Sequence, residues 1–366
     1  AYPKHYAVRN PAQGSASGIG ELVAPDSTTW PARPTPGVNR GYQPDVLRPD
    51  GTLASLTAAC GPTIYRAGLL GDGFRGNAFI CESAGLLVKR LEVSDKNGVP
   101  AAVNAYQGTE FLRSTDERFR PVNSLVGPDG GLYIIDMARG VIQHRTYVTP
   151  YLREQIKSRH LEKPLVLGRI LRIVPESGTP RARPHLGGAS DSRLVELLSD
   201  PDGWWRDTAQ RLLVERHAVG AEAGLRELSK SGATVPRLHA LWTLDGLGLL
   251  TEADALAAAS DKDATVRAAG ARLCETFLKS PAAVQRLLQM ADDGDWAVRV
   301  QVALTLGELK GKDATAALAG MLRRGEGDAR MRGAVVSGIG GRETTVLSDL
   351  LATPGWPRTD RGKAVL

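Results

Sequence analysis

The apolar positions of this chain follow two different periods, and the change falls near residue 190. Before it, apolar residues alternate with polar ones or run in short stretches between turn residues, as in Leu132–Asp136. After it, they recur every three or four residues in Ala-rich stretches. Alternation is typical of strands, and the longer period is typical of amphipathic helices. The chain is therefore predicted to be a β + α multidomain protein, with a β-rich part followed by helices.

A turn containing glycine, followed by leucine and a strand-like stretch, recurs three times in the β-rich part. The turn glycines are Gly51, Gly85 and Gly130, which are 34 and 45 residues apart. In the clearest copy, Pro128 presets one turn dihedral and Gly130 accepts a positive φ. The spacing is close to one four-stranded propeller blade. Residues 1–177 are predicted to form a partial β-propeller that contains its C-terminal blades, with further blades outside this sequence.

Three further segments complete the β-rich part. A last strand is predicted at 168–174, where apolar residues run up to Pro175. Residues 151–161 have helical spacing and a basic face, which predicts a surface helix inserted between two strands. Residues 178–189 are interpreted as a linker.

An arginine followed by an Ala-rich apolar stretch recurs five times in the second part. The arginines are separated by 31, 30, 32 and 33 residues, and they are Arg206, Arg237, Arg267, Arg299 and Arg332. Acidic turns such as 261–263 and 292–295 precede several copies, and an aspartate there can cap the following helix. Residues 190–352 are therefore predicted to form five pairs of a HEAT-like α-helical solenoid, with Arg–Asp contacts between neighbouring turns. Residues 353–366 are left as a tail.

The net charge of +6 is unevenly distributed. Residues 1–186 contain 23 basic and 16 acidic residues, and 151–186 alone contain 8 and 3. A basic stretch is either a solvated surface or a contact for an anionic partner. Nucleic acid is not expected as a partner, because no basic stripe with interleaved aromatic residues is present. No transmembrane segment is expected either, because no apolar run reaches 18 residues.

Few residues carry recognisable cofactor chemistry. The sequence has no C-x-x-C, C-x-x-C-H or H-E-x-x-H pattern, so neither a haem attachment nor a zinc site is expected in this segment. Three cysteines are too few for a disulfide-dense scaffold, and Cys274 lies in a helical pattern and is predicted to be buried. The sequence starts with Ala1 and stops in mid-pattern, so we expect that both ends are cut.

Several segments of the β-rich part resemble a known family. They are Phe111–Asn123 (FLRSTDERFRPVN), the 127–130 turn, 136–145 and 167–170, together with 59–62 and 76–82. This set resembles the propeller of the large membrane-bound dehydrogenase proteins of planctomycete-type bacteria, which are related to sorbosone and soluble glucose dehydrogenases. The resemblance covers nearly all of residues 1–177.

The resemblance implies a function and a location. It implies a fragment of a quinoprotein-like dehydrogenase that oxidises a sugar or other polyol with pyrroloquinoline quinone and calcium. Electrons would pass to a cytochrome c domain or protein, and the protein would be periplasmic or otherwise exported. In such a compartment Cys60 and Cys81 would pair across adjacent strands; the alternative is that they are two buried thiols.

The resemblance also implies site residues at the channel end of the blades. The comparable cofactor-binding positions are Arg40, Arg118, Arg120 and Asn123, because the guanidinium fork can bind quinone carboxylates. His144 is the candidate catalytic base for alcohol oxidation. Arg120 is expected to point toward the inner end of the blades. Alternatively, Arg118 pairs with a neighbouring carboxylate and His144 caps a strand end.

A propeller fold alone does not imply catalysis. The alternative function is a non-catalytic scaffold for binding carbohydrate or protein, in which the propeller and the HEAT-like repeats both serve as recognition surfaces.

Overall fold

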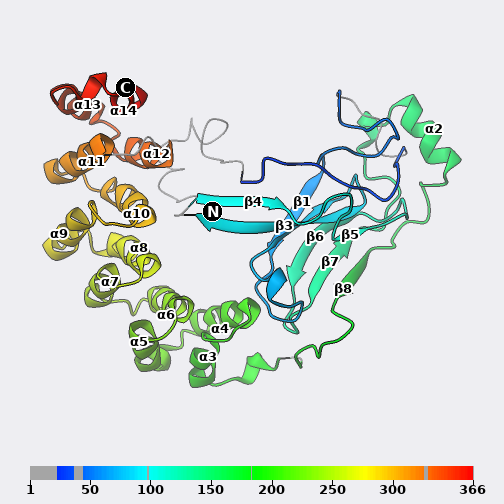
Figure 1. Ribbon diagram of the computed structural model, residues 1–366. Coiled ribbons are helices and arrows are strands. Elements are labelled where there is room, and N and C mark those ends of the chain that lie inside the picture. The colour runs from blue at the N-terminus through cyan, green and yellow to red at the C-terminus, as the bar shows by residue number, and fades with distance from the viewer. Residues whose placement is uncertain (1–22, 37–43, 97–98, 183, 325–328, 366) are drawn as a thin grey trace. The chain divides into compact units, whose positions relative to one another are not determined.

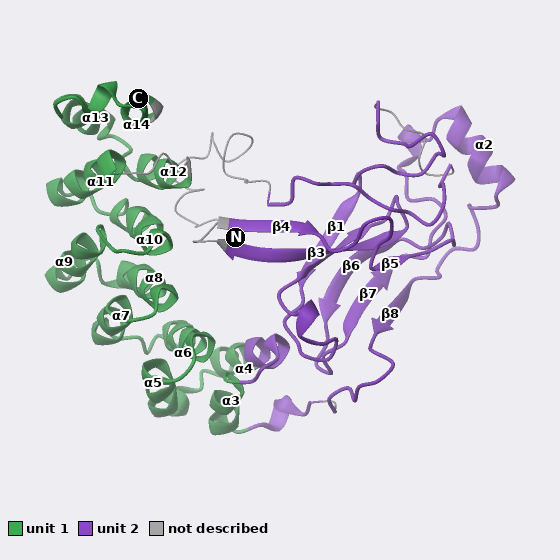
Figure 2. Ribbon diagram, viewed as in Figure 1, with its two compact units in different colours: residues 1–21, 190–199, 209–366 green, residues 22–189, 200–208 purple. Residues whose placement is uncertain are grey.

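The protein divides into two compact units in a computed structural model that describes residues 23–36, 44–96, 99–182, 184–324 and 329–365. Of these residues, the β unit comprises those in 23–189 together with 200–208, and the repeat unit comprises those in 190–199 and 209–365. Figure 2 shows the β unit in purple and the repeat unit in green. The predicted order, a β-rich region followed by helices, is confirmed.

The first sheet of the β unit is antiparallel and follows chain order. Its strands pair in the order β1-β2-β3-β4, and the short β5 also pairs with β3. The strands are β1 (Ala59–Ile64), β2 (Ala78–Glu82), β3 (Leu87–Lys96), β4 (Val99–Asn104) and β5 (Leu112–Arg113). The turn between β2 and β3 places Leu86, not Gly85, at positive φ (59°).

The second sheet contains the predicted hairpin. Strands β6 (Pro121–Val126), β7 (Leu132–Asp136) and β8 (Arg169–Ile173) pair antiparallel in that order. Gly130 has a φ of 84°, and Asp129 Oδ1 accepts a hydrogen bond of 3.0 Å from Gly131 N, as the turn chemistry predicted. The earliest predicted hairpin, around Gly51, contains only an isolated bridge between Leu47 and Leu53.

The two sheets share one apolar core. Phe79, Cys81 and Val88 from the first sheet pack in the same cluster as Leu132 and Ile134 from the second. These side chains are almost completely removed from solvent, and such burial is the main favourable term in folding. The core therefore forms where the alternating positions of the two sheets face each other.

Short helices occupy the edges of the β unit. The surface helix predicted at 151–161 is α2 (Pro150–Ser158), which Thr149 caps and which buries Leu152 and Ile156. Three single turns are η1 (Asp72–Phe74), η2 (Arg145–Tyr147) and η3 (Leu186–Gly188). Residues 200–208 also belong to this unit, and Trp205 Nε1 donates a hydrogen bond of 2.8 Å to Pro128 O at the hairpin.

The repeat unit is a stack of helix pairs. The pairs are α3 (Asp191–Leu197) with α4 (Gly203–Glu215), α5 (Glu222–Lys230) with α6 (Thr234–Gly246), α7 (Glu252–Ala259) with α8 (Ala264–Leu273), α9 (Pro281–Met290) with α10 (Trp296–Leu306), and α11 (Lys312–Arg324) with α12 (Ala329–Gly338). Short turns η4 (Val219–Ala221) and η5 (Cys274–Phe277) lie within the stack. All five repeated arginines lie on the second helix of their pair, as predicted, and the predicted range 190–352 also contains a further helix, α13, beyond the five pairs.

Neighbouring pairs pack through their equivalent helices. The second helices α6, α8, α10 and α12 contact one another in turn, and so do the first helices α7, α9, α11 and α13 (Figure 1). The segment left as a tail contains η6 (Trp356–Arg358) and α14 (Asp360–Val365), which follow α13 (Glu343–Leu351). Trp356 is buried in the same core cluster as the preceding helices. The apolar faces of successive pairs are thus buried only by stacking.

Candidate functional site

The turns of the repeat unit are built from an Asp-x-Asp-x-x-x-Arg motif. In the third pair, Asp263 Oδ1 caps α8 by accepting from Thr265 N and Val266 N, and Asp261 Oδ1 accepts from Asp263 N. Arg267 Nη1 then donates to the carbonyl of Asp261 at 2.9 Å. The turn preceding α10 repeats this pattern with Asp293, Asp295 and Arg299. The predicted capping role of the aspartates is confirmed at both turns.

The arginines also link one turn to the next. Arg267 donates from Nε (2.8 Å) and Nη2 (2.9 Å) to the two carboxylate oxygens of Asp293, and Arg237 pairs with Asp261. Burial raises the pKa of Asp293, but the hydrogen bonds from Arg267 and from the Asp295 N–H outweigh it, so the net pKa lies below its ordinary value. The predicted ladder of charge-assisted contacts is therefore confirmed for these two steps.

The first copy of the motif belongs to the β unit. Asp202 Oδ1 accepts a hydrogen bond from Gly68 N at 2.9 Å. Asp200 receives a bidentate pair of bonds from Arg181, at 2.7 and 2.9 Å. The same turn sequence is thus used here to attach residues 200–208 to the β unit.

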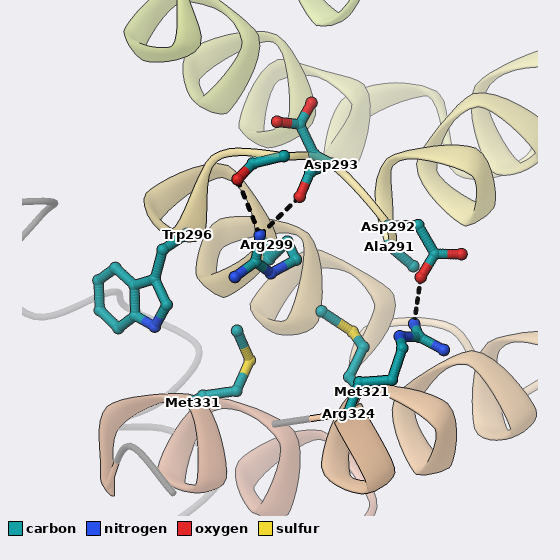
Figure 3. A pocket seen from close by; sticks show the side chains of 9 residues that line it. Ala291, Asp292, Asp293, Trp296, Arg299, Met321, Arg324 and Met331 are labelled. Atoms are coloured by element: carbon teal, nitrogen blue, oxygen red, sulfur yellow. Dashed lines mark hydrogen bonds and ion pairs between the residues drawn. The ribbon is translucent and has the colours of Figure 1, made fainter. Parts of the chain in front are cut away.

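A cavity of about 280 Å³ adjoins the turn before α10. Its apolar walls are Trp296 from α10, Met321 from α11 and Met331 from α12. Figure 3 shows Trp296 and Met331 on one side of the cavity, with Met321 beside Arg324 and Asp292 on the other. The cavity lies entirely within the repeat unit.

Charged groups surround this apolar interior. Arg324 Nη2 lies 2.5 Å from Asp292 Oδ1, and both side chains are more than half exposed. Arg299 donates to the carbonyls of Asp293 (2.7 Å) and Gly294 (3.1 Å). The guanidinium of Arg330 lies 4.3 Å from the centre of the Trp296 ring, which is a cation–π distance. Apolar walls with a charged rim suit the binding of an apolar side chain.

Sequence reasoning did not single out Trp296, although a signal was present. The residue three positions before each repeated arginine is Gly203, Thr234, Ala264, Trp296 or Ala329. Only the fourth copy has a large side chain at this small-residue position. The cavity lies beside that exception.

Arg120 is a buried residue of the β unit whose side chain donates hydrogen bonds to backbone carbonyls. It is completely buried, and its guanidinium donates to three carbonyls: Ser83 O (2.9 Å), Arg139 O (3.0 Å) and Gly140 O (3.3 Å). Burial lowers the pKa of Arg120 to about 10, against the opposing pull of nearby carboxylates. Arg120 is therefore not an exposed rim residue, and its donors are directed at its own chain.

The other predicted site residues are placed differently. Arg118 Nη2 donates to His160 O (2.7 Å) and Lys163 O (3.0 Å), so its side chain pairs with carbonyls and not with a neighbouring carboxylate. His144 is exposed and caps η2 by accepting from Thr146 N. Asn123 is exposed on β6, and Arg40 lies outside the described residues. The side chains of Arg118, His144 and Asn123 are not among the residues that line the cavity beside Trp296.

The two cysteines of the β unit lie directly opposite each other. Cys60 on β1 is the register partner of Cys81 on β2, and both are free thiols. Burial raises the pKa of Cys81 to about 12. Cys274 is buried, as predicted.

Among the described residues, no group of three or more His, Cys, Asp or Glu side chains is arranged to hold a metal ion. No helix within these residues has the length and apolar character needed to cross a membrane.

Comparisons with known proteins match two regions of the chain to family models. Residues 252–340 match HEAT repeats, and residues 1–177 match a domain of unknown function (DUF7133). The predicted HEAT-like class is confirmed. A search of curated proteins finds no match to the chain.

Two solved structures are weakly similar to this chain and each covers 48% of it. The X-ray structure of YibA from Escherichia coli is 15% identical, with a TM-score of 0.32, over 48% of this chain and 83% of that one. A crystal structure of an engineered protein is 17% identical, with a TM-score of 0.28, over 48% of this chain and 94% of that one.

Proposed function

We propose that the chain is a non-catalytic recognition scaffold whose repeat unit holds an apolar side chain of a partner protein in the cavity beside Trp296. The observation that carries this proposal is the cavity itself. Its volume of about 280 Å³ lies just below the range for small-molecule pockets, roughly 300–1,000 Å³. It therefore suits one large side chain better than a whole cofactor.

The lining supports a protein ligand. Methionine side chains adapt to differently shaped apolar groups and are common at binding surfaces, and Met321 and Met331 form opposite walls of the cavity. Tryptophan and arginine are enriched among residues that dominate binding energy. Asp292 and Arg324 at the rim would orient the backbone of the bound segment through hydrogen bonds.

The test uses Trp296→Ala, because other copies of the repeat already have a small residue there and the variant should fold. Peptides selected from a random display library against the full chain are expected to contain one large apolar residue. Their affinity should fall at least about tenfold in Trp296→Ala, the loss expected when a central anchor is removed. Val336→Ala, an exposed apolar position on α12, is the matched control. Selected peptides that bind Trp296→Ala as well as the parent protein would rule the cavity out.

The dehydrogenase function stays a prediction from resemblance. A quinone carboxylate would have to displace backbone carbonyls from Arg120, because its Nε, Nη1 and Nη2 each already donate to one. Arg118 Nη2 is engaged in the same way, whereas its Nε has no hydrogen-bond partner among the described residues. Arg120 therefore does not fit the quinone in this arrangement, and we derive no step through it. The prediction has its own assay, which is dye reduction by the chain with pyrroloquinoline quinone, calcium and a sugar panel.

We further propose that the two sheets are neighbouring blades of a propeller. Four of the five strands of the first sheet, β1 to β4, pair in simple chain order, as in a propeller blade. On the second sheet, the face opposite Leu132 and Ile134 carries Leu125 and Ile170, which are 43% and 68% exposed. Another blade packing there would bury both. In a longer natural chain, Ile170→Asp should then be destabilising, whereas in this chain it should be nearly neutral.

A further inference from the structure

A second cavity, of about 550 Å³, lies between α11 and α13. Its lining includes four cations and one anion, which are Lys310, Lys312, Arg323, Arg342 and Asp349. We call this cavity the basic groove. The excess of positive charge is local, because residues 187–366 contain 23 basic and 24 acidic residues.

Among the described residues, most of this positive charge forms no ion pair. Arg323 Nη1 donates to Asp349 Oδ2 at 2.7 Å, which neutralises one cation. In the part of the chain that the structure describes, no carboxylate lies within ion-pair distance of Lys310, Lys312 or Arg342. Both lysines are exposed. Three cations therefore remain for a ligand.

Arg342 makes two hydrogen bonds within the protein and has a third nitrogen donor, Nε, without a partner among the described residues. Its Nη1 donates to Thr315 Oγ1 at 2.7 Å, and its Nη2 donates to Gly338 O. Its Nε is buried and has no hydrogen-bond partner among the described residues. A buried donor without a partner costs free energy, and an incoming acceptor would remove that cost.

Apolar groups separate these cations. Ala316, Ala319 and Val346 contribute to the lining between the two helices. A bare inorganic anion would leave this surface uncovered, and a nucleic acid would find no aromatic side chain in the lining on which to stack a base. The ligand that matches both features carries carboxylates on either side of an aliphatic group.

We infer that the basic groove binds an acidic segment of a partner protein, in which aspartate or glutamate residues flank an aliphatic side chain. The aliphatic group packs on the alanines and Val346, and the carboxylates pair with Lys310, Lys312 and Arg342. This inference does not depend on the cavity beside Trp296, because the two sites share no lining residue.

The experiment uses the full chain and a panel of fluorescein-labelled nonapeptides. Each peptide has a central leucine flanked by Asp or Glu, and its partner peptide has Asn or Gln at the same positions. Binding is measured by fluorescence anisotropy at about 50 and about 200 mM salt. We expect the acidic peptides to bind at least about tenfold more tightly than their neutral partners, with affinity falling as salt rises.

Three variants separate the groove from general charge attraction. Lys310→Glu/Lys312→Glu should weaken binding at least about tenfold, whereas Lys262→Glu, an exposed lysine in another turn, should change it less than about twofold. Ala316→Trp should block the groove without changing its charge. Circular dichroism checks that each variant is folded.

Several outcomes would overturn the inference. They are equal binding of acidic and neutral peptides, no binding by any acidic peptide, and unchanged affinity in the double lysine variant or in Ala316→Trp. Displacement of the peptide by millimolar inorganic phosphate would instead identify a small-anion site, and tighter binding of single-stranded DNA would identify a nucleic-acid site. Either of these two results also contradicts the inference.

Discussion

Replacing Arg120 with methionine tests whether this residue is structural or reserved for a ligand. The structure places its guanidinium on the carbonyls of Ser83, Arg139 and Gly140, in a fully buried position. Ser83 follows β2 of the first sheet, and residues 139–140 follow β7 of the second. Arg120 therefore joins the two sheets through bonds that no local segment could supply.

The expected cost follows from those three bonds. A hydrogen bond from a charged donor contributes about 1.5–3 kcal/mol, and each buried carbonyl left without a donor adds a penalty. Against this, methionine removes a buried charge that is costly to desolvate. Loss of one partner from such a buried network typically costs about 3–5 kcal/mol, and we expect Arg120→Met to destabilise the β unit by that amount.

The assay is urea unfolding followed by hydrogen exchange, so that the loss is localised to a unit. Amides of β6, β7 and the 83–86 turn should exchange faster in Arg120→Met, while α7–α10 keep their protection. Arg118→Met is the control, because its two carbonyl contacts are near the surface, and its cost should be about 1 kcal/mol. A loss below about 1 kcal/mol in Arg120→Met would refute the structural role and leave this arginine available for the quinone.

Three other changes have defined outcomes. Gly270→Ala should cost about 3 kcal/mol or more by thermal unfolding, because the added Cβ would lie 2.1 Å from Ala259 N, whereas Gly340→Ala meets no atom within 4 Å and should be neutral. An oxidised-glutathione buffer should join Cys60 to Cys81, which is detected as loss of thiol alkylation, and the closed loop of roughly 20 residues should stabilise the chain by about 3 kcal/mol. The reaction should become faster as pH rises, because burial raises the pKa of both thiols. Alkylation of both thiols after long exposure to the buffer would contradict the pairing. The pKa of Asp293 is lowered in the folded state, so its contribution to stability is present above its unfolded pKa and is lost as pH falls through the folded pKa. Asp293→Asn should therefore be less stable at neutral pH, but its stability should fall less steeply below about pH 4. Identical dependence of stability on acid pH in both proteins would refute this.

The repeat unit was largely predictable because its contacts are local or recur at a fixed period. Asp263 and Asp295 cap helices through bonds to residues two and three positions away, so the short motif is sufficient to predict them. Stacking then brings equivalent positions of successive pairs together, which is why the spacing of the arginines predicted the contact between Arg267 and Asp293. The hairpin at Gly130 was predictable for the same reason, since its turn chemistry lies within four residues.

The sites depended on contacts between residues far apart in the chain. The family resemblance pointed to Arg120 as a cofactor-binding residue, but its carbonyl partners come from segments that meet only when the two sheets pack. Asp202 has the same local sequence context as the capping aspartates, yet it bonds Gly68 N because residues 200–208 pack on the β unit. The cavity beside Trp296 and the basic groove are spaces between helices, and their shape follows from how side chains of successive pairs fit together. Local sequence determines turns, caps and helical periods because they depend on a few dihedral angles and on short-range hydrogen bonds. The surroundings of a buried charge and the shape of a cavity depend instead on which atoms from distant parts of the chain come within a few ångströms of one another.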